Sequence, residues 1–197
     1  MTDKNKKTLE EIHNYWINRS LPKLYLNQVK RSEFLTEYIK KYVISSDRIL
    51  EIGCNAGRNL NHLKQHNYKH LTGIEISEEA IRELKKSFPS LYKNAEIIHA
   101  PIENVIKQLP SNHYDLVFTM AVLEHIHPDS EWIFQDMARI AKSFVITVEA
   151  ENAEHWRVFP RNYKKIFEKY GLKQLEEARC DKDLGLGAYT IRVLKKN

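Results

Sequence analysis

The sequence predicts an α/β fold in which a mostly parallel sheet carries helices on both faces. The first observation is an alternation, between residues 47 and 149, of short apolar runs with helix-like segments of about 10 to 15 residues. Such alternation favours right-handed crossover connections and therefore parallel strands. The second is a change after Pro160, where one helical segment precedes two strand-like segments joined by the glycine-containing stretch 181–187. These last two strands are expected to form an antiparallel hairpin.

The individual elements follow from local signals in chain order. Between residues 9 and 42 apolar and aromatic residues recur at helical spacing, interrupted near Pro22, which predicts two helices ahead of the sheet. Apolar or β-branched runs predict seven strands, at 47–53, 70–76, 95–99, 114–120, 143–149, 172–179 and 188–194. Further helices are predicted to open near Leu60 and to cover 77–88, 128–141 and 161–170.

The chain has no internal repeat or low-complexity linker, so we expect a single domain over residues 1–197. Within it, residues 1–46 are predicted to form an N-terminal helical cap that folds over the site as a lid. Residues 47–197 are predicted to form the core, and a hydrophobic content of 42% is sufficient to build it without cross-links.

The charge and the cysteine content indicate the cellular compartment and limit the kinds of partner. The net charge of +5 owes much to terminal lysines, a pattern that is typical of a solvated surface and disfavours a nucleic-acid partner. These lysines are Lys4, Lys6, Lys7, Lys195 and Lys196. Cys54 and Cys180 lie far apart, and the sequence contains neither an export signal nor an apolar run of about 18 residues. We therefore expect a cytoplasmic protein without a membrane span, either a monomer or a homodimer.

The strongest motif is E-I-G-C-N-A-G at residues 51–57, between the first predicted strand and its helix. Glycine has no Cβ and lets a ligand approach the backbone, and the amides of a helix start donate hydrogen bonds. Glu75, which lies 22 residues beyond Gly53, ends the second strand, where its carboxylate can accept from both hydroxyls of a ribose. The dinucleotide fingerprint G-x-G-x-x-G fails at Asn55 and Arg58, which disfavours a nicotinamide cofactor.

The motif resembles the first motif of the class I S-adenosylmethionine-dependent methyltransferases, E/D-x-G-x-G-x-G. Glu51, Gly53 and Gly57 match it, and Asn55 replaces the middle glycine. Asparagine enters the left-handed region more readily than other non-glycine residues, so this replacement is tolerable. The resemblance covers residues 47–194. It implies a Rossmann-like seven-stranded fold, S-adenosyl-L-methionine as the cofactor and S-adenosyl-L-homocysteine as the product.

The resemblance also implies which residues hold the cofactor. Glu51 and the glycine loop would hold its amino-acid end, and apolar residues after the second and third strands would pack on the adenine. The implied cofactor-binding residues are Glu51, Gly53, Cys54, Asn55, Gly57, Glu75, Ile76, Pro101, Ile102 and Met120. Pro101 stands where the family commonly has an aspartate, so the adenine amine lacks that partner unless Glu103 reaches it.

His125, just beyond the fourth strand, is the candidate general base, because imidazole titrates near neutrality. The same position also fits a histidine that caps or packs the following turn, and His127 is a weaker candidate for the base. Glu124 and His125 suggest a metal site, but Met120 and Ala121 supply no further ligand for a hard ion, so we expect no metal.

Acceptor binding is expected from the lid and from the long polar and aromatic connection after the fifth strand. The candidates are Tyr15, Trp16, His155, Arg157 and Arg161. Core packing of the aromatic residues and solvation of the arginines account for the same residues without a ligand.

We therefore expect methyl transfer to an oxygen or nitrogen of a small metabolite, such as a sugar, a polar lipid precursor or a secondary metabolite. No [N/D/S]-P-P-[Y/F/W] motif follows the fourth strand, which disfavours methylation of exocyclic base amines. Neither cysteine is placed for pyrimidine C5 chemistry. An RNA or nucleoside methyltransferase, suggested by the pI near 9.0, and a non-catalytic cofactor-binding regulatory subunit are the alternatives.

Overall fold

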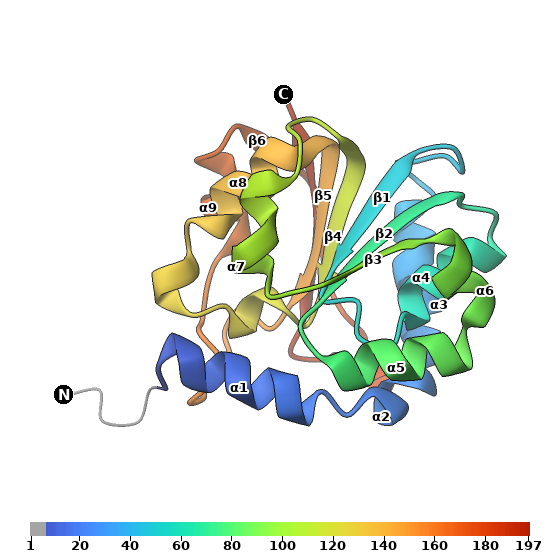
Figure 1. Ribbon diagram of the computed structural model, residues 1–197. Helices are drawn as coiled ribbons and strands as arrows, with labels where there is room; N and C mark the ends of the chain where they lie inside the picture. The colour runs from blue at the N-terminus through green and yellow to red at the C-terminus, as the bar shows by residue number, and fades with distance from the viewer. Residues whose placement is uncertain (1–6) are drawn as a thin grey trace.

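Seven strands form one sheet in the order β3-β2-β1-β4-β5-β7-β6 in the computed structural model, which describes residues 7–197 (Figure 1). They are β1 (Arg48–Ile52), β2 (His70–Glu75), β3 (Glu96–His99), β4 (Tyr114–Met120), β5 (Ala141–Glu149), β6 (Leu172–Arg179) and β7 (Thr190–Lys196). Neighbouring strands among β1 to β5 run parallel, whereas β7 lies antiparallel between β5 and β6. The predicted fold class, with its C-terminal antiparallel hairpin, is confirmed. Lys4 and Lys6 lie outside the described residues.

Helices cover both faces of this sheet (Figure 1). They are α1 (Leu9–Arg19), α2 (Pro22–Leu26), α3 (Val29–Ile39), α4 (Arg58–Gln65), α5 (Glu78–Ser87), α6 (Pro89–Asn94), α7 (Ile102–Val105), α8 (Ile133–Ile140) and α9 (Tyr163–Glu168). Consecutive strand residues enter opposite cores, as Ile49 and Leu50 of β1 do. Residues of α7, α8 and α9 share the core of Leu50, and residues of α3 to α6 share that of Ile49. Within residues 7–197, no helix combines the length and the apolar character needed to cross a membrane.

Capping residues explain where several helices begin. The side chain of Thr8 accepts from the Glu11 amide and the Glu11 side chain accepts from the Thr8 amide, so α1 starts with a capping box. The Ser77 hydroxyl caps α5 in a similar way by accepting from the Ala80 amide. Pro22 and Pro89 occupy the starts of α2 and α6, where a helix needs no amide donor.

The helices differ from the sequence-based prediction in three respects. The cap contains three helices rather than two: the predicted break lies at Leu21 (φ 44°), and a second break at Asn27 and Gln28 separates α2 from α3. The short helices α6 and α7 were not predicted, since they are too short to show helical periodicity. The helix predicted at 128–141 spans only Ile133–Ile140, because Ala141 already pairs with Tyr114 in the sheet.

The cap is attached to the carboxyl edge of the sheet. In Figure 1, α1 runs beneath the strand ends. The Ser20 carbonyl accepts from Asn55 Nδ2 at 3.0 Å, and the Ser20 hydroxyl donates to the Ser77 hydroxyl at 2.8 Å. Because Asn55 follows β1 and Ser77 follows β2, these bonds hold the cap over the tips of two adjacent strands.

Gly73 of β2 supports the turn that follows β1. A Cβ at this position would lie 2.7 Å from Cys54 Sγ and 2.8 Å from Leu60 Cδ1. We predict that Gly73→Ala destabilises the protein by about 1–3 kcal/mol through overpacking, as measured by urea denaturation. Gly187→Ala is the comparison variant: its Cβ would lie 2.6 Å from Cγ of Lys182, but Lys182 is exposed and can move toward solvent, whereas Cys54 and Leu60 are buried. Equal losses in the two variants would contradict this account.

Candidate active site

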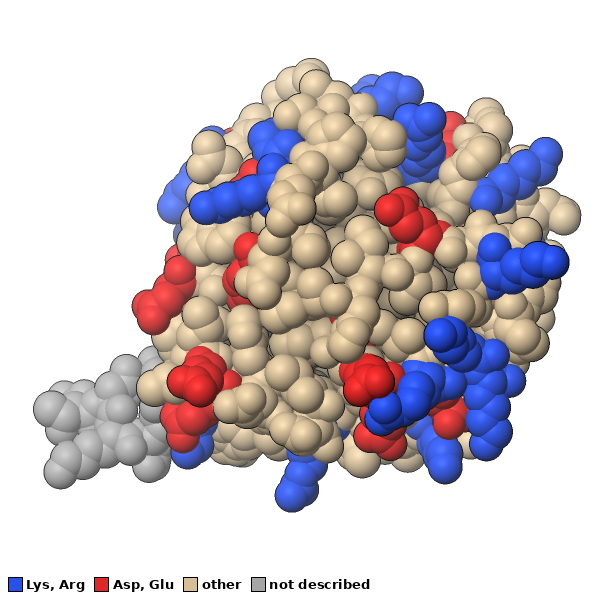
Figure 2. All heavy atoms as spheres, viewed as in Figure 1, with Lys and Arg blue, Asp and Glu red and all other residues tan. Residues whose placement is uncertain are grey.

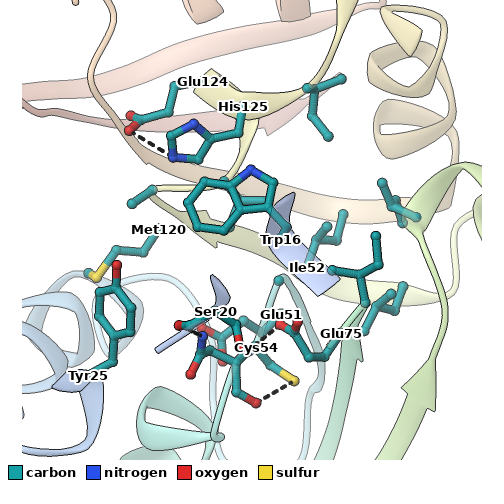
Figure 3. Close-up of a pocket in the computed structure, with 18 of the residues that line it drawn as sticks. Trp16, Ser20, Tyr25, Glu51, Ile52, Cys54, Glu75, Met120, Glu124 and His125 are labelled. Carbon is teal, nitrogen blue, oxygen red and sulfur yellow. Dashed lines mark hydrogen bonds and ion pairs between the residues drawn. The ribbon is translucent and has the colours of Figure 1, made fainter. Parts of the chain in front are cut away.

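A cavity of about 450 Å³ lies between the carboxyl edge of the sheet and the cap, within the range typical of small-molecule sites. Its floor consists of the ends of β1, β2 and β4 and the turns that follow them, and residues of α1, α2 and the start of α3 cover it. Figure 3 shows part of this lining.

The turn after β1 adopts the conformation that its sequence suggested. Gly53, Asn55 and Gly57 have φ values of 73°, 48° and 74°, so all three lie in the left-handed region. Asn55 tolerates it partly because its side-chain oxygen accepts from the Ala56 amide at 2.7 Å. Asn55, at the middle position of the motif, therefore adopts the left-handed backbone conformation that glycine would adopt there.

Glu75 joins this turn to the next strand. Its two carboxylate oxygens accept from the amides of Asn55 and Ser77, each at 2.8 Å, and its side chain is buried. Burial raises its pKa, while these hydrogen bonds lower it. Each carboxylate oxygen has a second lone pair, so Glu75 can still accept hydrogen bonds from a diol in the cavity.

Glu51, at the end of β1, is a buried acid with unused hydrogen-bonding capacity. Its Oε1 accepts from Asn59 Nδ2 at 2.7 Å, whereas its Oε2 has no partner among the described residues. Burial raises its pKa to about 8. A buried carboxyl oxygen without a partner is costly. Its environment fits a ligand that brings a cationic or hydrogen-bond-donating group, such as the amino group of an amino acid.

The part of the cavity wall formed by the residues that follow β2 and β3 is largely apolar. It includes Ile76, Pro101 and Ile102, which are among the residues expected to bind the cofactor. Glu103 lines it as well, but its carboxylate contacts His13 Nε2 of α1 at 3.1 Å. Burial raises the pKa of Glu103, but its hydrogen bonds, among them those with His13 and Ser130, and the charge of His13 together outweigh this effect, so the pKa lies below its usual value. This carboxylate therefore binds the cap in addition to facing the cavity.

His125 lies away from Glu75, in the turn Leu123–His125 (Figure 3). Its Nδ1 lies 2.8 Å from the Arg157 carbonyl oxygen, which can only accept, so Nδ1 carries the proton. Nε2 is then the basic nitrogen, and it lies 3.5 Å from Glu124 Oε1. The Trp16 ring packs 4.5 Å from the imidazole, and burial lowers the pKa of His125 to about 4. At neutral pH the imidazole is therefore uncharged, with a basic nitrogen beside a carboxyl group.

Two buried carboxyls order the segment that carries His125. Glu124 accepts from the Ala150 amide and the Tyr189 hydroxyl, and Glu149 accepts from the Thr119 hydroxyl at 2.7 Å and the Val122 amide at 3.0 Å. Burial raises the pKa of both groups, that of Glu149 to about 8. The sequence analysis missed this role of Glu149, although an acid that ends an apolar strand is a recognisable signal.

Most of the residues predicted for cofactor binding lie together in the cavity wall. These are Glu51, Gly53, Cys54, Asn55, Glu75, Ile76, Pro101, Ile102 and Met120, and His125, Trp16 and Arg157 line the same cavity. Gly57 lies behind the wall, where a Cβ would meet Leu84 of α5, so its role is to allow close packing.

Three predicted acceptor residues do not line the cavity. Tyr15 and His155 contact Trp156, and Tyr15 lies with Trp16 and Trp156 around the guanidinium of Arg157. Arg161 is turned away, because its guanidinium donates to the carbonyls of Leu123 and Ile126 and pairs with Glu131. Arg161 therefore supports the His125 turn from behind, which corrects its predicted contact with an acceptor.

The cavity also includes residues that the sequence did not single out for it. They come from the cap, from α4 and from the C-terminal hairpin: Ser20, Gln28, Arg31, Arg58 and Tyr189. The indole Nε1 of Trp16 is buried and makes no hydrogen bond within residues 7–197. The same part of the chain contains no group of three or more His, Cys, Asp or Glu side chains arranged to hold a metal ion.

Comparisons with known proteins agree with this geometry. Residues 49–143 match the family model of a methyltransferase domain. Over 121 residues the chain is 31% identical to the mitochondrial ubiquinone biosynthesis O-methyltransferase of Schizosaccharomyces pombe, a match that covers 59% of this chain and 43% of that protein. The chain therefore spans less than half the length of this curated relative.

Solved structures share the fold. Magnesium protoporphyrin IX methyltransferase from Synechocystis PCC 6803 with bound SAH superposes with a TM-score of 0.77 at 13% identity, covering 95% of this chain and 99% of that one. The same enzyme with bound SAM gives 0.74 at 15% identity, covering all of both chains. A SAM-dependent methyltransferase from Archaeoglobus fulgidus gives 0.66 at 17% identity, covering 86% of this chain and 95% of that one.

These matches agree with the sheet order and with the conformation of the glycine loop. They confirm the predicted family, and with it S-adenosylmethionine as the cofactor. Residues 49–143 therefore belong to a methyltransferase domain, and the chain as a whole has the fold of S-adenosylmethionine-dependent methyltransferases.

Proposed function

We propose that this protein transfers a methyl group from S-adenosylmethionine to an oxygen or nitrogen atom of a small metabolite. The observation that carries the proposal is a single cavity with the glycine loop, Glu51 and Glu75 at one end and the basic nitrogen of His125 at the other. Cofactor and acceptor would therefore meet within one enclosed space.

When bound, the cofactor supplies an activated methyl group, so the protein has mainly to position the acceptor, exclude water and accept a proton. Glu75 would bind the ribose hydroxyls, and Glu51 the amino group. Trp16 of the cap shields the acceptor end. His125 Nε2 would take the acceptor proton, and the carboxyl of Glu124, 3.5 Å away, would stabilise the resulting imidazolium.

The similar proteins support a small acceptor. The S. pombe relative is an O-methyltransferase of ubiquinone biosynthesis, and the Synechocystis enzyme methylates magnesium protoporphyrin IX. Both act on small organic molecules. We propose an acceptor of this size, in the class of sugars, polar lipid precursors or secondary metabolites, and we propose that nucleic acid is not the substrate.

An RNA or nucleoside acceptor has one observation in its favour. Exposed basic residues of α5 and α6, namely Arg82, Lys85, Lys86 and Lys93, belong to a group of basic side chains that Figure 2 shows interspersed with acidic ones. Retention on RNA with a steep dependence on salt concentration would favour this acceptor. If the protein binds the cofactor but methylates no component of any cell extract, this result would instead favour a non-catalytic regulatory subunit.

We also propose that the protein is a single-domain monomer or homodimer of the cytoplasm. Cys54 and Cys180 are both buried and unpaired, which is consistent with a reducing compartment.

The role of Glu75 can be tested by cofactor binding alone. We predict that Glu75→Gln weakens the affinity for S-adenosylhomocysteine by about one to two orders of magnitude, or about 1.5 to 3 kcal/mol, because a hydrogen bond to a charged group is lost. Titration calorimetry measures this change, with thermal denaturation to verify folding. Glu79→Gln, an exposed neighbour on α5, should bind as the parent does. Unchanged affinity in a folded Glu75→Gln variant would exclude the ribose role.

The raised pKa of Glu51 predicts proton release on binding. With a pKa of about 8 this carboxyl is mostly protonated at pH 7, and a cationic amino group beside it would favour the carboxylate. S-Adenosylhomocysteine binding at pH 7 should therefore release a proton, so that the calorimetric enthalpy differs between phosphate and Tris buffers. The difference should shrink at pH 9 and disappear in Glu51→Gln. A buffer dependence that Glu51→Gln retains would refute this assignment.

His125 should affect turnover rather than cofactor affinity. We predict that His125→Gln slows methyl transfer from radiolabelled cofactor into fractionated cell extract by about 100-fold or more, in the range of general-base effects. Affinity for S-adenosylhomocysteine should stay within about twofold of the parent's, because the His125 side chain lies at the end of the cavity away from Glu75. His155→Gln, on the exposed part of the same connection, is the control. An unchanged rate in His125→Gln would remove the imidazole from the mechanism.

A further inference from the structure

The connection between β5 and α9 contains a tight turn at residues 155–158. Its first and last residues exchange two backbone hydrogen bonds, at 3.0 and 3.3 Å. The next residue, Phe159, donates its amide to the Glu124 carbonyl at 2.8 Å, so the turn is bonded to the residue that precedes His125. The two residues at the tip of the turn contact α1 of the cap.

Arg157, one of these tip residues, places its guanidinium among three aromatic rings. Its Cζ lies 5.4 Å from the centres of the Tyr15 and Trp16 rings and 5.8 Å from that of Trp156. Tyr15 also packs edge to face on Trp156, with 5.0 Å between the ring centres. Within residues 7–197 this guanidinium donates no hydrogen bond and forms no ion pair, so the rings are its principal contacts. Cation–π attraction therefore joins the cap to the turn.

The carbonyl of the same arginine determines which nitrogen of the imidazole carries the proton. The Arg157 oxygen lies 2.8 Å from His125 Nδ1, and a carbonyl can only accept, so Nδ1 is protonated and Nε2 is the basic nitrogen. The Trp16 ring packs on the imidazole as well, with 4.5 Å between the ring centres. The two groups that orient the imidazole, the Arg157 carbonyl and the Trp16 ring, are therefore groups that the cap contacts or supplies.

Two of the three aromatic residues lie outside the cavity. Trp16, Arg157 and His125 line it, whereas Tyr15 and Trp156 do not. Tyr15 and Trp156 therefore face neither a cofactor nor an acceptor, and any effect that they have on the imidazole passes through Arg157 or Trp16. The hydrogen bonds between the cap and the turns after β1 and β2 do not involve these two rings, so the cap stays attached when either ring is removed.

We propose that Tyr15 and Trp156 are positioning residues for His125. They hold the Arg157 guanidinium, and with it the carbonyl that keeps the proton on Nδ1 of the imidazole. This inference rests on the proposed function, in which His125 Nε2 takes the acceptor proton. It makes closure of the cap a condition for an aligned base, because without α1 the guanidinium loses two of its three rings and the imidazole loses Trp16. Closure that both encloses the acceptor and completes the site is a form of induced fit.

The first measurement identifies the tautomer of His125 from the nitrogen chemical shifts of its ring, in isotope-labelled protein saturated with S-adenosylhomocysteine at neutral pH. The His125→Gln variant assigns the resonances. We expect a protonated Nδ1 and an unprotonated Nε2 in the parent, and a mixture of both tautomers in Tyr15→Leu and in Trp156→Leu. Tyr92→Leu is the matched control, because it also removes a ring beside a cation, that of Lys85, but outside the cavity. It should keep the parental tautomer. A protonated Nε2 in the parent would overturn the proposal.

The second measurement is the rate of methyl transfer from radiolabelled cofactor. We expect Tyr15→Leu to slow the transfer by about tenfold or more through misalignment of the base, while its affinity for S-adenosylhomocysteine stays within about twofold of the parent's. Tyr15→Phe, which keeps the ring, should retain both the tautomer and the rate. If a Tyr15→Leu variant that thermal denaturation shows to be folded keeps the parental tautomer or the parental rate, the positioning role is wrong and the proposed function stands. A parent that neither binds S-adenosylhomocysteine nor transfers a methyl group would instead reject the proposed function, and the positioning role with it.

Discussion

One buried carboxylate, that of Glu75, holds the site together. It accepts from the amide of Asn55 in the turn after β1 and from the amide of Ser77 at the start of α5. The same two residues bind Ser20 of the cap, Asn55 through its amide group and Ser77 through its hydroxyl. Turn, strand tip and cap therefore form one hydrogen-bonded unit around the cavity. Such preorganisation lowers the conformational cost of binding a ligand.

The distribution of charged groups around the cavity favours one orientation of a bound ligand. Acids occupy the strand tips, and arginines come from the cap, α4 and the connection after β5. The imidazole of His125 is uncharged at pH 7, because burial lowers its pKa to about 4. A sulfonium cofactor with a cationic amino group suits the acidic strand tips. Electrostatic complementarity of this kind favours specificity and orientation more than raw affinity.

The sequence predicted those parts of the fold and site that contiguous residues encode. The strands followed from short apolar runs, and the glycine loop from a seven-residue motif in which even Asn55 takes the left-handed conformation. It did not reveal Arg31 or Tyr189 as neighbours in the cavity, because only the three-dimensional fold brings the cap and the C-terminal hairpin together. Arg161 shows the converse. A polar residue in a segment expected to bind the acceptor can instead donate its hydrogen bonds to backbone carbonyls. Residue type alone does not distinguish this structural role from acceptor binding.

The buried ionisable groups show why this frame is suited to a ligand. The pKa of Glu51 is raised from 4.5 to about 8, so its contribution to stability is present below pH 4.5 and is lost as pH rises through 8. The pKa of His125 is lowered to about 4, so its contribution is present above about pH 6.5 and is lost as pH falls through 4. Both groups are therefore neutral at pH 7. The folded state loses stability at alkaline pH, where Glu51 ionises, and at acidic pH, where His125 is protonated. A cation beside Glu51 would remove the cost on the alkaline side. The fold therefore maintains at Glu51 an unfavourable environment that the bound cofactor, with its amino group, would convert into a favourable one.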